Sequence, residues 1–189
     1  MGRVALWGLL ALPALAIAGR WGLTPDDYGF GHAIKQSGDW AAWLLLATLA
    51  VTPLRLALGT RPVTRWLGMR RRDLGVASFA YAAIHTGIYL ADKSGLDAIL
   101  AEARGAELLT GWMALALFTP LAITSNDRSV RALKRRWKQL HRLVYPAAVL
   151  VFVHWALTAF DPATAYWHIA ILAAIETARI ALQYRQRVT

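Results

Sequence analysis

Three histidines in this sequence lie in or beside long apolar stretches, where an imidazole ring can do chemistry. His85 and His154 lie within such stretches, and His141 lies at the basic start of the stretch that contains His154. Burying an imidazole in a bilayer costs free energy unless the ring has a partner, so an intramembrane histidine marks a candidate functional site. Two imidazoles that face each other at one depth could bind a haem iron from its two sides. The elements that carry these rings therefore decide whether such a site can form.

Six apolar runs approach the length that a helix needs to cross a membrane, which is ~20 residues for a hydrocarbon layer about 30 Å thick. The runs cover residues 4–18, 40–59, 74–91, 107–124, 143–160 and 165–182. The first also fits a secretory signal with a cleavage site at residues 16–18, but an odd number of spans would then remain. We therefore expect an all-α, polytopic membrane bundle of six transmembrane helices. Because the loops are short and no linker or repeat occurs, residues 1–189 are predicted to form one domain.

The composition agrees with a membrane protein and excludes several kinds of site. Hydrophobic residues make up 57% of the chain, and nine residues are Trp. There is no cysteine, which excludes disulfides, iron–sulfur clusters and thiolate metal sites. The net charge of +10 could suggest nucleic acid as a partner. The basic residues, however, gather in loops between apolar runs rather than on one soluble face, which argues against nucleic-acid binding.

Lysine and arginine are distributed unequally across the predicted membrane. If the N-terminus is cytoplasmic, the opposite side holds four of the 21, namely Arg20, Lys35, Lys93 and Arg104, and the cytoplasmic side holds the other 17. The positive-inside rule then places both termini in the cytoplasm. Topology and contact with anionic membrane lipid explain most of the basic clusters at 70–72 and 128–138, although one or two members could neutralise a haem propionate or a flavin phosphate.

His85 and His154 fall at similar depths in this topology. The third span runs outward from Asp73, which puts His85 in its outer half, and the fifth span runs outward to Phe160, which puts His154 at a similar level. We therefore predict that these two rings hold a haem iron, with the second nitrogen of each ring oriented by a nearby acceptor. The alternative is that they are unrelated polar positions, each satisfied by a backbone carbonyl or a hydroxyl group.

His141 precedes His154 by 13 residues, or about 20 Å along a helix, which would suit a second haem. The two rings would then lie roughly 140° apart around an ideal helix, although Pro146 interrupts the backbone ladder between them. A second ligand on the third span would fall near residues 70–73, where no histidine occurs. Two interpretations stay open: His141 is half of an irregular second haem site, or it is an interfacial residue that contacts lipid headgroups.

The remaining polar positions are weaker candidates. His168, at the outer start of the last span beside Trp167, fits an aromatic belt, and His32 lies in a polar outer loop. Glu176 and Arg179 are spaced to form an ion pair on one helix. Residues 96–101 fit a short amphipathic helix on the outer surface. No Gly-rich nucleotide motif or P-loop occurs, so we expect no nicotinamide domain.

With its histidines placed, the sequence resembles the MsrQ (YedZ) family, the haem-binding membrane subunits of periplasmic methionine-sulfoxide reductase systems, within the ferric-reductase-like transmembrane superfamily. The resemblance covers nearly the whole chain, and the order and spacing of its segments are more specific than any one segment. The segments are residues 46–54, 71–75, 78–85, 122–125, 136–145 and 153–154. The chain departs from the family where relatives often place a histidine before the Thr-Gly that opens the second helix, because it has Lys35-Gln-Ser-Gly38 there.

The resemblance implies one or two b-type haems, with haem-associated histidines at His85, His141 and His154. It implies a location in the bacterial inner membrane and electron delivery to a periplasmic molybdopterin-containing subunit that reduces oxidised methionine in proteins. Some family members are associated with FMN and a cytoplasmic flavin reductase, and quinol is the other electron source considered.

Residues and resemblance together predict a subunit for transmembrane electron transfer that does not itself act on methionine sulfoxide. An electron would enter near His141, pass to the haem between His85 and His154, and leave to a partner docked on outer loops 19–39 and 92–107. One rival is a stand-alone ferric or superoxide-forming reductase, which would reduce ferric chelates without a partner. The other is a cofactor-free scaffold subunit, which would lack reduced b-type absorption bands after haem-replete expression.

Overall fold

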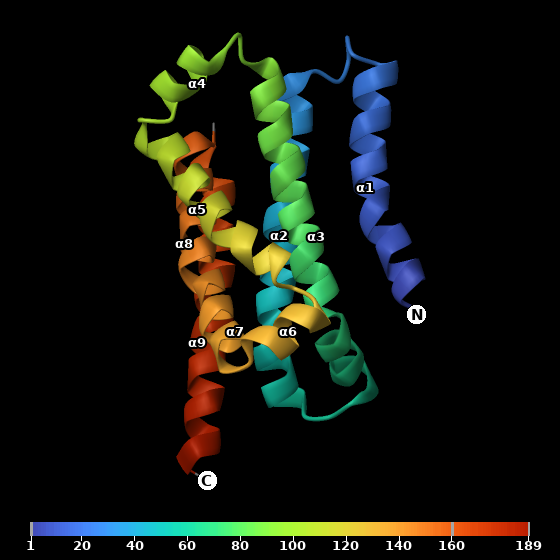
Figure 1. Ribbon diagram of the computed structural model, residues 1–189, viewed down its shortest axis with the longest axis vertical. Coiled ribbons are helices and arrows are strands. Elements are labelled where there is room, and N and C mark those ends of the chain that lie inside the picture. The colour runs from blue at the N-terminus through green and yellow to red at the C-terminus, as the bar shows by residue number, and fades with distance from the viewer. Residues whose placement is uncertain (1, 160, 189) are drawn as a thin grey trace.

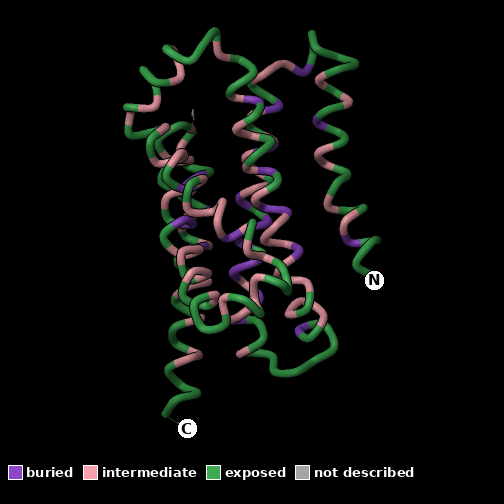
Figure 2. The backbone as a smooth tube through the Cα atoms, in the orientation of Figure 1, coloured by how far each residue is buried: buried purple, intermediate pink, exposed green. Residues whose placement is uncertain are grey.

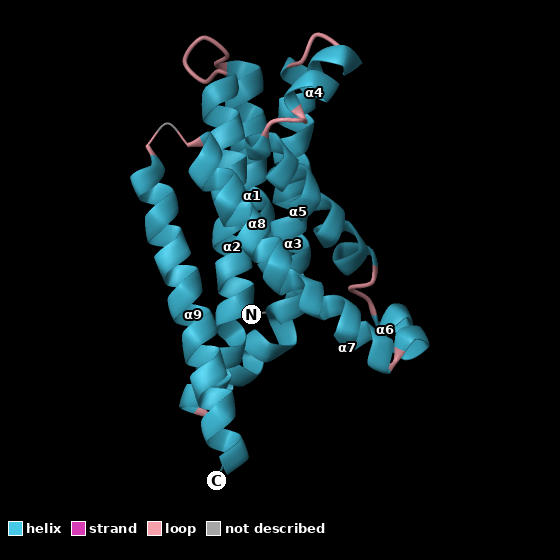
Figure 3. Ribbon diagram, turned by 90° about the vertical axis from the view of Figure 1, so that its left-hand side faces the viewer, coloured by secondary structure: helices cyan, strands magenta, loops and turns pink. Residues whose placement is uncertain are grey.

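The computed structural model describes residues 2–159 and 161–188, and helices dominate this part of the chain (Figures 1 and 3). In chain order the helices are α1 (Arg3–Leu23), α2 (Phe30–Leu58), α3 (Pro62–Asp92), α4 (Leu96–Glu102), α5 (Ala106–Ile123), α6 (Asp127–Leu133), α7 (Arg135–Leu140), the 3-10 turn η1 (His141–Leu143), α8 (Val144–Thr158) and α9 (Pro162–Val188). No strand occurs in these two described ranges.

Six helical segments are long and apolar enough to cross a membrane: α1, α2, α3, α5, the segment Arg135–Thr158 and α9. The predicted all-α bundle of six membrane helices is therefore confirmed. Several helices extend past the predicted apolar runs, since α3 begins at Pro62 and α9 continues to Val188. Arginine is a good helix former, so a helix can continue through a polar, arginine-rich segment beyond the hydrocarbon layer. Phe160, where the predicted fifth span ended, lies outside the described residues.

A tight connection joins α2 to α3 and makes them antiparallel neighbours. Gly59 follows the last turn of α2 with φ at +68°, a left-handed conformation that glycine adopts without steric cost. Pro62 then occupies the first turn of α3, where its missing N–H would have no helical partner anyway. Thr64 donates its hydroxyl to Gly59 O at 2.6 Å and ties the connection down.

α2 is the central helix of the bundle. It packs most extensively on α3 and also contacts α1, α8 and α9, while α5 and α8 form the second closely packed pair. Buried residues concentrate in the middle of the bundle (Figure 2). Small side chains allow the helices to approach closely at these contacts, as is usual for membrane helices. The buried alanines include Ala42, Ala77, Ala114, Ala147 and Ala148.

α1 lies at the edge of the bundle and is held at two points (Figure 1). At its start, Arg3 makes an ion pair with the buried Asp73 of α3 at 2.9 Å. Farther along, the Tyr81 hydroxyl donates to Leu10 O at 2.7 Å and accepts from Ala14 N at 3.0 Å. An α-helix normally joins these two backbone groups directly, so the hydroxyl is inserted into the backbone ladder of α1, next to Pro13.

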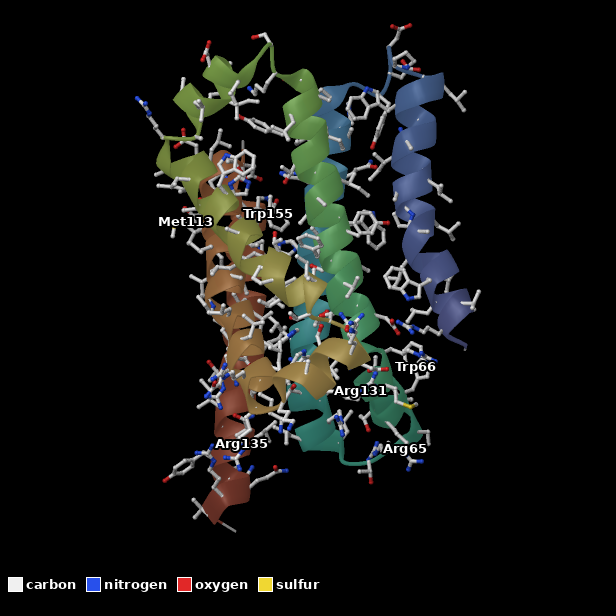
Figure 4. All side chains as sticks on the ribbon, in the orientation of Figure 1. Arg65, Trp66, Met113, Arg131, Arg135 and Trp155 are labelled. Atoms are coloured by element: carbon white, nitrogen blue, oxygen red, sulfur yellow. The ribbon has the colours of Figure 1, made fainter. Side chains whose placement is uncertain are left out.

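The two ends of the bundle differ in charge. Arg65, Arg131 and Arg135 gather at the end of the bundle toward which both termini point, whereas Met113 and Trp155 lie in the opposite half (Figure 4). The connection between α5 and α8 crosses the basic end as α6, α7 and η1, although the sequence suggested only a basic loop there.

Candidate functional site

His85 of α3 and His154 of α8 lie opposite each other inside the bundle. Their ring centres are 6.2 Å apart, and their ring planes meet at 87°. Imidazoles bound to opposite sides of one metal ion, at about 2 Å per metal–nitrogen bond, place their ring centres roughly 6 Å apart. The structure thus brings these two predicted site residues together at a spacing that suits a shared metal.

A backbone carbonyl from a neighbouring helix orients each ring. His85 Nδ1 lies 2.9 Å from Ile34 O of α2, and His154 Nδ1 lies 2.6 Å from Glu107 O of α5. Because a carbonyl oxygen only accepts hydrogen bonds, each Nδ1 carries the proton and each Nε2 keeps its lone pair. A neutral imidazole oriented through its other nitrogen is the form that ligates metals.

A cavity of about 630 Å³ lies between the α2–α3 and α5–α8 pairs, with both rings in its wall. Most of the wall is apolar, and Phe118 and Trp155 contribute large rings. The end of the cavity away from the arginine-rich end of the bundle is polar. The residues there include Lys35, Asp39, Tyr89, Asp161 and Thr164. This volume is typical of cofactor sites, and an apolar slot with two unprotonated Nε2 atoms fits a haem ligated on both faces.

Comparison with known proteins agrees with this geometry. The family described as "Ferric reductase like transmembrane component" matches residues 37–153, a segment that contains His85 and ends one residue before His154. Among the relatives named protein-methionine-sulfoxide reductase heme-binding subunit MsrQ are three with the following similarity. They come from Ralstonia nicotianae (37% identical over 162 residues, 81% of this chain and 71% of the relative), Rhizobium meliloti (39% over 163 residues, 82% and 72%) and Brucella ovis (39% over 174 residues, 90% and 75%).

The chain belongs to the MsrQ family of ferric-reductase-like membrane proteins. No solved structure gives a significant match to it.

Two glycines of this MsrQ-family chain, and the carbonyls beside them, escaped the sequence analysis. A Cβ atom on Gly38 would lie 3.1 Å from His85 Nδ1, and one on Gly111 would lie 2.9 Å from His154 Nδ1. In each case the glycine follows the carbonyl acceptor by four residues. Every glycine inside a helix follows some carbonyl by four residues, so this spacing by itself gives no signal in the sequence.

His141, the third predicted site residue, lies apart from the other two. It is in η1 and does not line the cavity. Thr124 Oγ1 donates to Pro120 O at 2.6 Å, so it accepts from His141 Nε2 at 3.0 Å. The His141 ring also stacks on Trp137, with 3.9 Å between ring centres. Only Nδ1 of His141 is thus left for another group, and a second histidine does not approach it in the described ranges.

His168 corrects the prediction of an outer aromatic belt position. Its side chain is 6% exposed, and its ring lies 4.5 Å from the Trp43 ring and 4.4 Å from the Trp155 ring. The belt prediction was wrong because the rotation of α9 about its axis turns residue 168 toward α2 and α8, where its ring meets the Trp43 and Trp155 rings. The adjacent Trp167 points outward and is 73% exposed.

The expected ion pair on α9 forms. Arg179 pairs with Glu176 at 2.6 Å, and its guanidinium lies over the Tyr145 ring, 4.2 Å from the ring centre. His32 is exposed, as expected, and stacks on Tyr28, but it lies in the first turn of α2 rather than in a loop.

Beside the polar end of the cavity, the predicted short helix forms as α4 and is held against the end of α3. Glu102 accepts from Lys93 and from the Tyr89 hydroxyl, each at 2.8 Å. The hydrogen bonds from Lys93 and Tyr89 lower the pKa of the Glu102 carboxyl. The hydrogen bond to Glu102 in turn raises the pKa of Lys93. The hydrogen bonds among Glu102, Lys93 and Tyr89 join α4 to the part of α3 that borders the cavity, because Tyr89 also lines the cavity.

Proposed function

We propose that this chain is the b-type haem membrane subunit of a protein-methionine-sulfoxide reductase system and carries electrons across the bacterial inner membrane. The recipient is a periplasmic molybdopterin-containing reductase subunit, and the donor is quinol or a cytoplasmic flavin reductase with FMN. The names of the MsrQ relatives support the haem and the reductase system. The observation that carries the proposal is the pair of imidazoles 6.2 Å apart across an apolar cavity.

Different residues of the cavity would have different roles in holding a haem. His85 and His154 would ligate the iron through Nε2, and the haem would supply one-electron redox chemistry. Phe118 and Trp155 form part of the apolar wall that keeps water from the site. Lys35 lines the polar end and pairs with Asp39 at 2.6 Å, so its ammonium would have to exchange this partner to neutralise a propionate. The chain itself makes and breaks no bond in a substrate.

In this proposal all 189 residues form one transmembrane domain with both termini in the cytoplasm. The 17 cytoplasmic lysines and arginines support this orientation, and so does the position of the labelled arginines in Figure 4. The polar end of the cavity then faces the periplasm. Segments 19–39 and 92–107, which include the α1–α2 connection and α4, would then form the docking surface for the reductase subunit.

The test is the haem content and the redox spectrum of purified His85→Ala, His154→Ala and His141→Ala proteins, with the exposed His32→Ala as control. We expect the first two variants to lose the same low-spin haem, because each removes one of two ligands. His141→Ala should keep that haem, since its ring bonds to Thr124 outside the cavity. Loss of all haem in His141→Ala, with no effect of His85→Ala, would refute the pairing. Wild-type protein without reduced b-type bands would favour the scaffold rival.

A further inference from the structure

The α2–α3 pair contains a self-contained support for the His85 ring. The ring, on α3, donates from Nδ1 to Ile34 O of α2 at 2.9 Å. Gly38, one turn further along α2, lies directly against the ring: a Cβ there would be 3.1 Å from Nδ1 and 3.2 Å from Cε1. Ser37 Oγ is close as well, at 3.5 Å from Nδ1.

The α5–α8 pair repeats this arrangement for the other histidine. The His154 ring, on α8, donates from Nδ1 to Glu107 O of α5 at 2.6 Å. Gly111, again four residues after the acceptor, is packed even more closely. A Cβ there would lie 2.9 Å from Nδ1, 3.0 Å from Cε1 and 3.3 Å from Cγ.

Helix geometry explains why a glycine belongs four residues after each acceptor. The carbonyl of residue i already accepts the N–H of residue i+4, and its second lone pair is free for another donor. The Cβ of residue i+4 points toward the helix N-terminus, so a side chain there covers the carbonyl of residue i. A glycine at i+4 leaves that carbonyl open, and an imidazole from the adjacent helix can reach it.

We propose that Gly38 and Gly111 are positioning residues that set the two ligand planes at right angles around the bound iron. This inference rests on the proposed haem site. Each glycine lets its histidine reach a carbonyl, and the direction of that carbonyl sets the rotation of the ring. Because the two supports belong to different helix pairs, the rings are oriented independently, and they meet at 87°.

The angle between ligand planes has a spectroscopic signature in the ferric state. Parallel imidazole planes split the two iron d orbitals that interact with them, whereas perpendicular planes leave these orbitals nearly degenerate. A low-spin ferric haem with perpendicular ligands therefore gives an electron paramagnetic resonance (EPR) spectrum with an unusually large highest g value. We expect this large-g signal from the wild-type protein.

The experiment compares EPR spectra of haem-loaded wild type, Gly111→Ala, Gly38→Ala and the matched control Gly87→Ala. Gly87 lies on α3, and a Cβ there meets no atom within 4 Å, so the control adds the same methyl group to a helix without touching the site. Gly111→Ala should lose most of the large-g signal, because its methyl group displaces the His154 ring. Gly38→Ala should lose less, since its closest contact is longer. Gly87→Ala should match wild type.

Carbon monoxide binding to the reduced protein supplies a second readout. Iron ligated by two histidines has no open position, so wild type and Gly87→Ala should not bind carbon monoxide. Gly111→Ala should bind it wherever His154 has left the iron. Both readouts report the ligands themselves, which a general loss of stability would not shift in this graded order.

The outcomes separate this inference from the proposed function. Haem-free wild type, or an unchanged low-spin signal in His154→Ala, would remove the proposed haem site itself. A wild-type signal typical of parallel planes, or a Gly111→Ala spectrum identical to that of Gly87→Ala, would overturn the role of the glycines while the haem site stands. If Gly111→Ala binds no haem, the EPR spectrum of Gly38→Ala becomes the test. A Gly38→Ala spectrum identical to that of Gly87→Ala would also overturn the inference.

Discussion

Asp73 is the residue that holds the start of α1. Its side chain is 5% exposed, and Oδ1 accepts from the Arg3 guanidinium and from Trp7 Nε1 at 3.2 Å. Arg70 approaches its other oxygen at 3.6 Å. A buried carboxylate is tolerated only when such donors surround it. One α3 side chain therefore gathers the start of α1 against the bundle.

Asp73→Asn should lower the free energy of unfolding by about 1.5–3 kcal/mol, the range for hydrogen bonds to a charged group. The loss should stay below that of a fully buried ion pair, because the Arg3 side chain is 65% exposed and water can solvate it. Unfolding in detergent micelles measures the change. Asp92→Asn, at the exposed end of the same helix, is the control and should change stability by less than about 0.5 kcal/mol. Equal stability of the two variants would contradict this role for Asp73.

Single residues also show what the sequence could and could not predict. The matching depths of His85 and His154 follow from where their apolar runs begin and end. The carbonyl acceptors and the packed glycines depend instead on the rotation of α2 and α5 about their axes. Lipid and protein core are both apolar, so a membrane helix has no polar stripe in its sequence from which that rotation could be predicted. The burial of His168 was missed for the same reason.

Among the elements, α1 is attached to α3 by the Tyr81 side chain, which is inserted into the backbone hydrogen-bond ladder of α1. The Tyr81 hydroxyl lies between Leu10 O and Ala14 N at the turn that contains Pro13. Tyr81→Phe removes both hydrogen bonds and leaves the ring packed. We expect faster amide hydrogen exchange in α1 and unchanged exchange in α2 and α3, measured by mass spectrometry on peptides from each helix.

The exposed Tyr184 provides the control for this change. Its side chain is 69% exposed, so Tyr184→Phe should leave exchange in α1 at the wild-type rate. Unchanged protection of α1 in Tyr81→Phe would show that the hydroxyl does not hold the helix.

α4 should detach from α3 at low pH. The pKa of Glu102 lies below its ordinary value of 4.5, because Lys93 and Tyr89 donate to the carboxylate. A depressed carboxyl pKa stabilises the folded arrangement above pH 4.5, and that stabilisation is lost as the pH falls through the lower, folded-state pKa. A spin label on Leu100→Cys can report the change, because the chain has no other cysteine and Leu100 is 54% exposed.

The label should be ordered at neutral pH and become mobile as the pH falls below 4.5, the ordinary Glu value. In a Glu102→Gln background it should be mobile at both pH values, since no carboxylate remains to hold Lys93. A label equally mobile in both proteins at neutral pH would show that the Glu102 cluster does not fix α4.

At the scale of the whole molecule, the site is an interface between two helix pairs. α2 supports the histidine of α3, α5 supports the histidine of α8, and the cavity lies between the pairs. α9 packs on α2 and α8 and closes one side, whereas α1 adds no residue to the cavity wall. Each helix pair therefore contains the support for its own histidine, and a haem bound between the pairs would join them.

The proposed electron transfer has a direction only if the bundle has the predicted orientation. The cavity shares its polar end with the loops that carry few lysines and arginines, and the other end carries 17 of the 21. A single cysteine at Leu96, in α4, should react with a membrane-impermeant maleimide added to intact spheroplasts. A single cysteine at Val188, near the C-terminus, should react only after lysis. Both positions are about 70% exposed, and the cysteine-free parent should stay unlabelled. The reverse pattern would turn the cavity toward the cytoplasm, and a periplasmic reductase could not receive electrons from it.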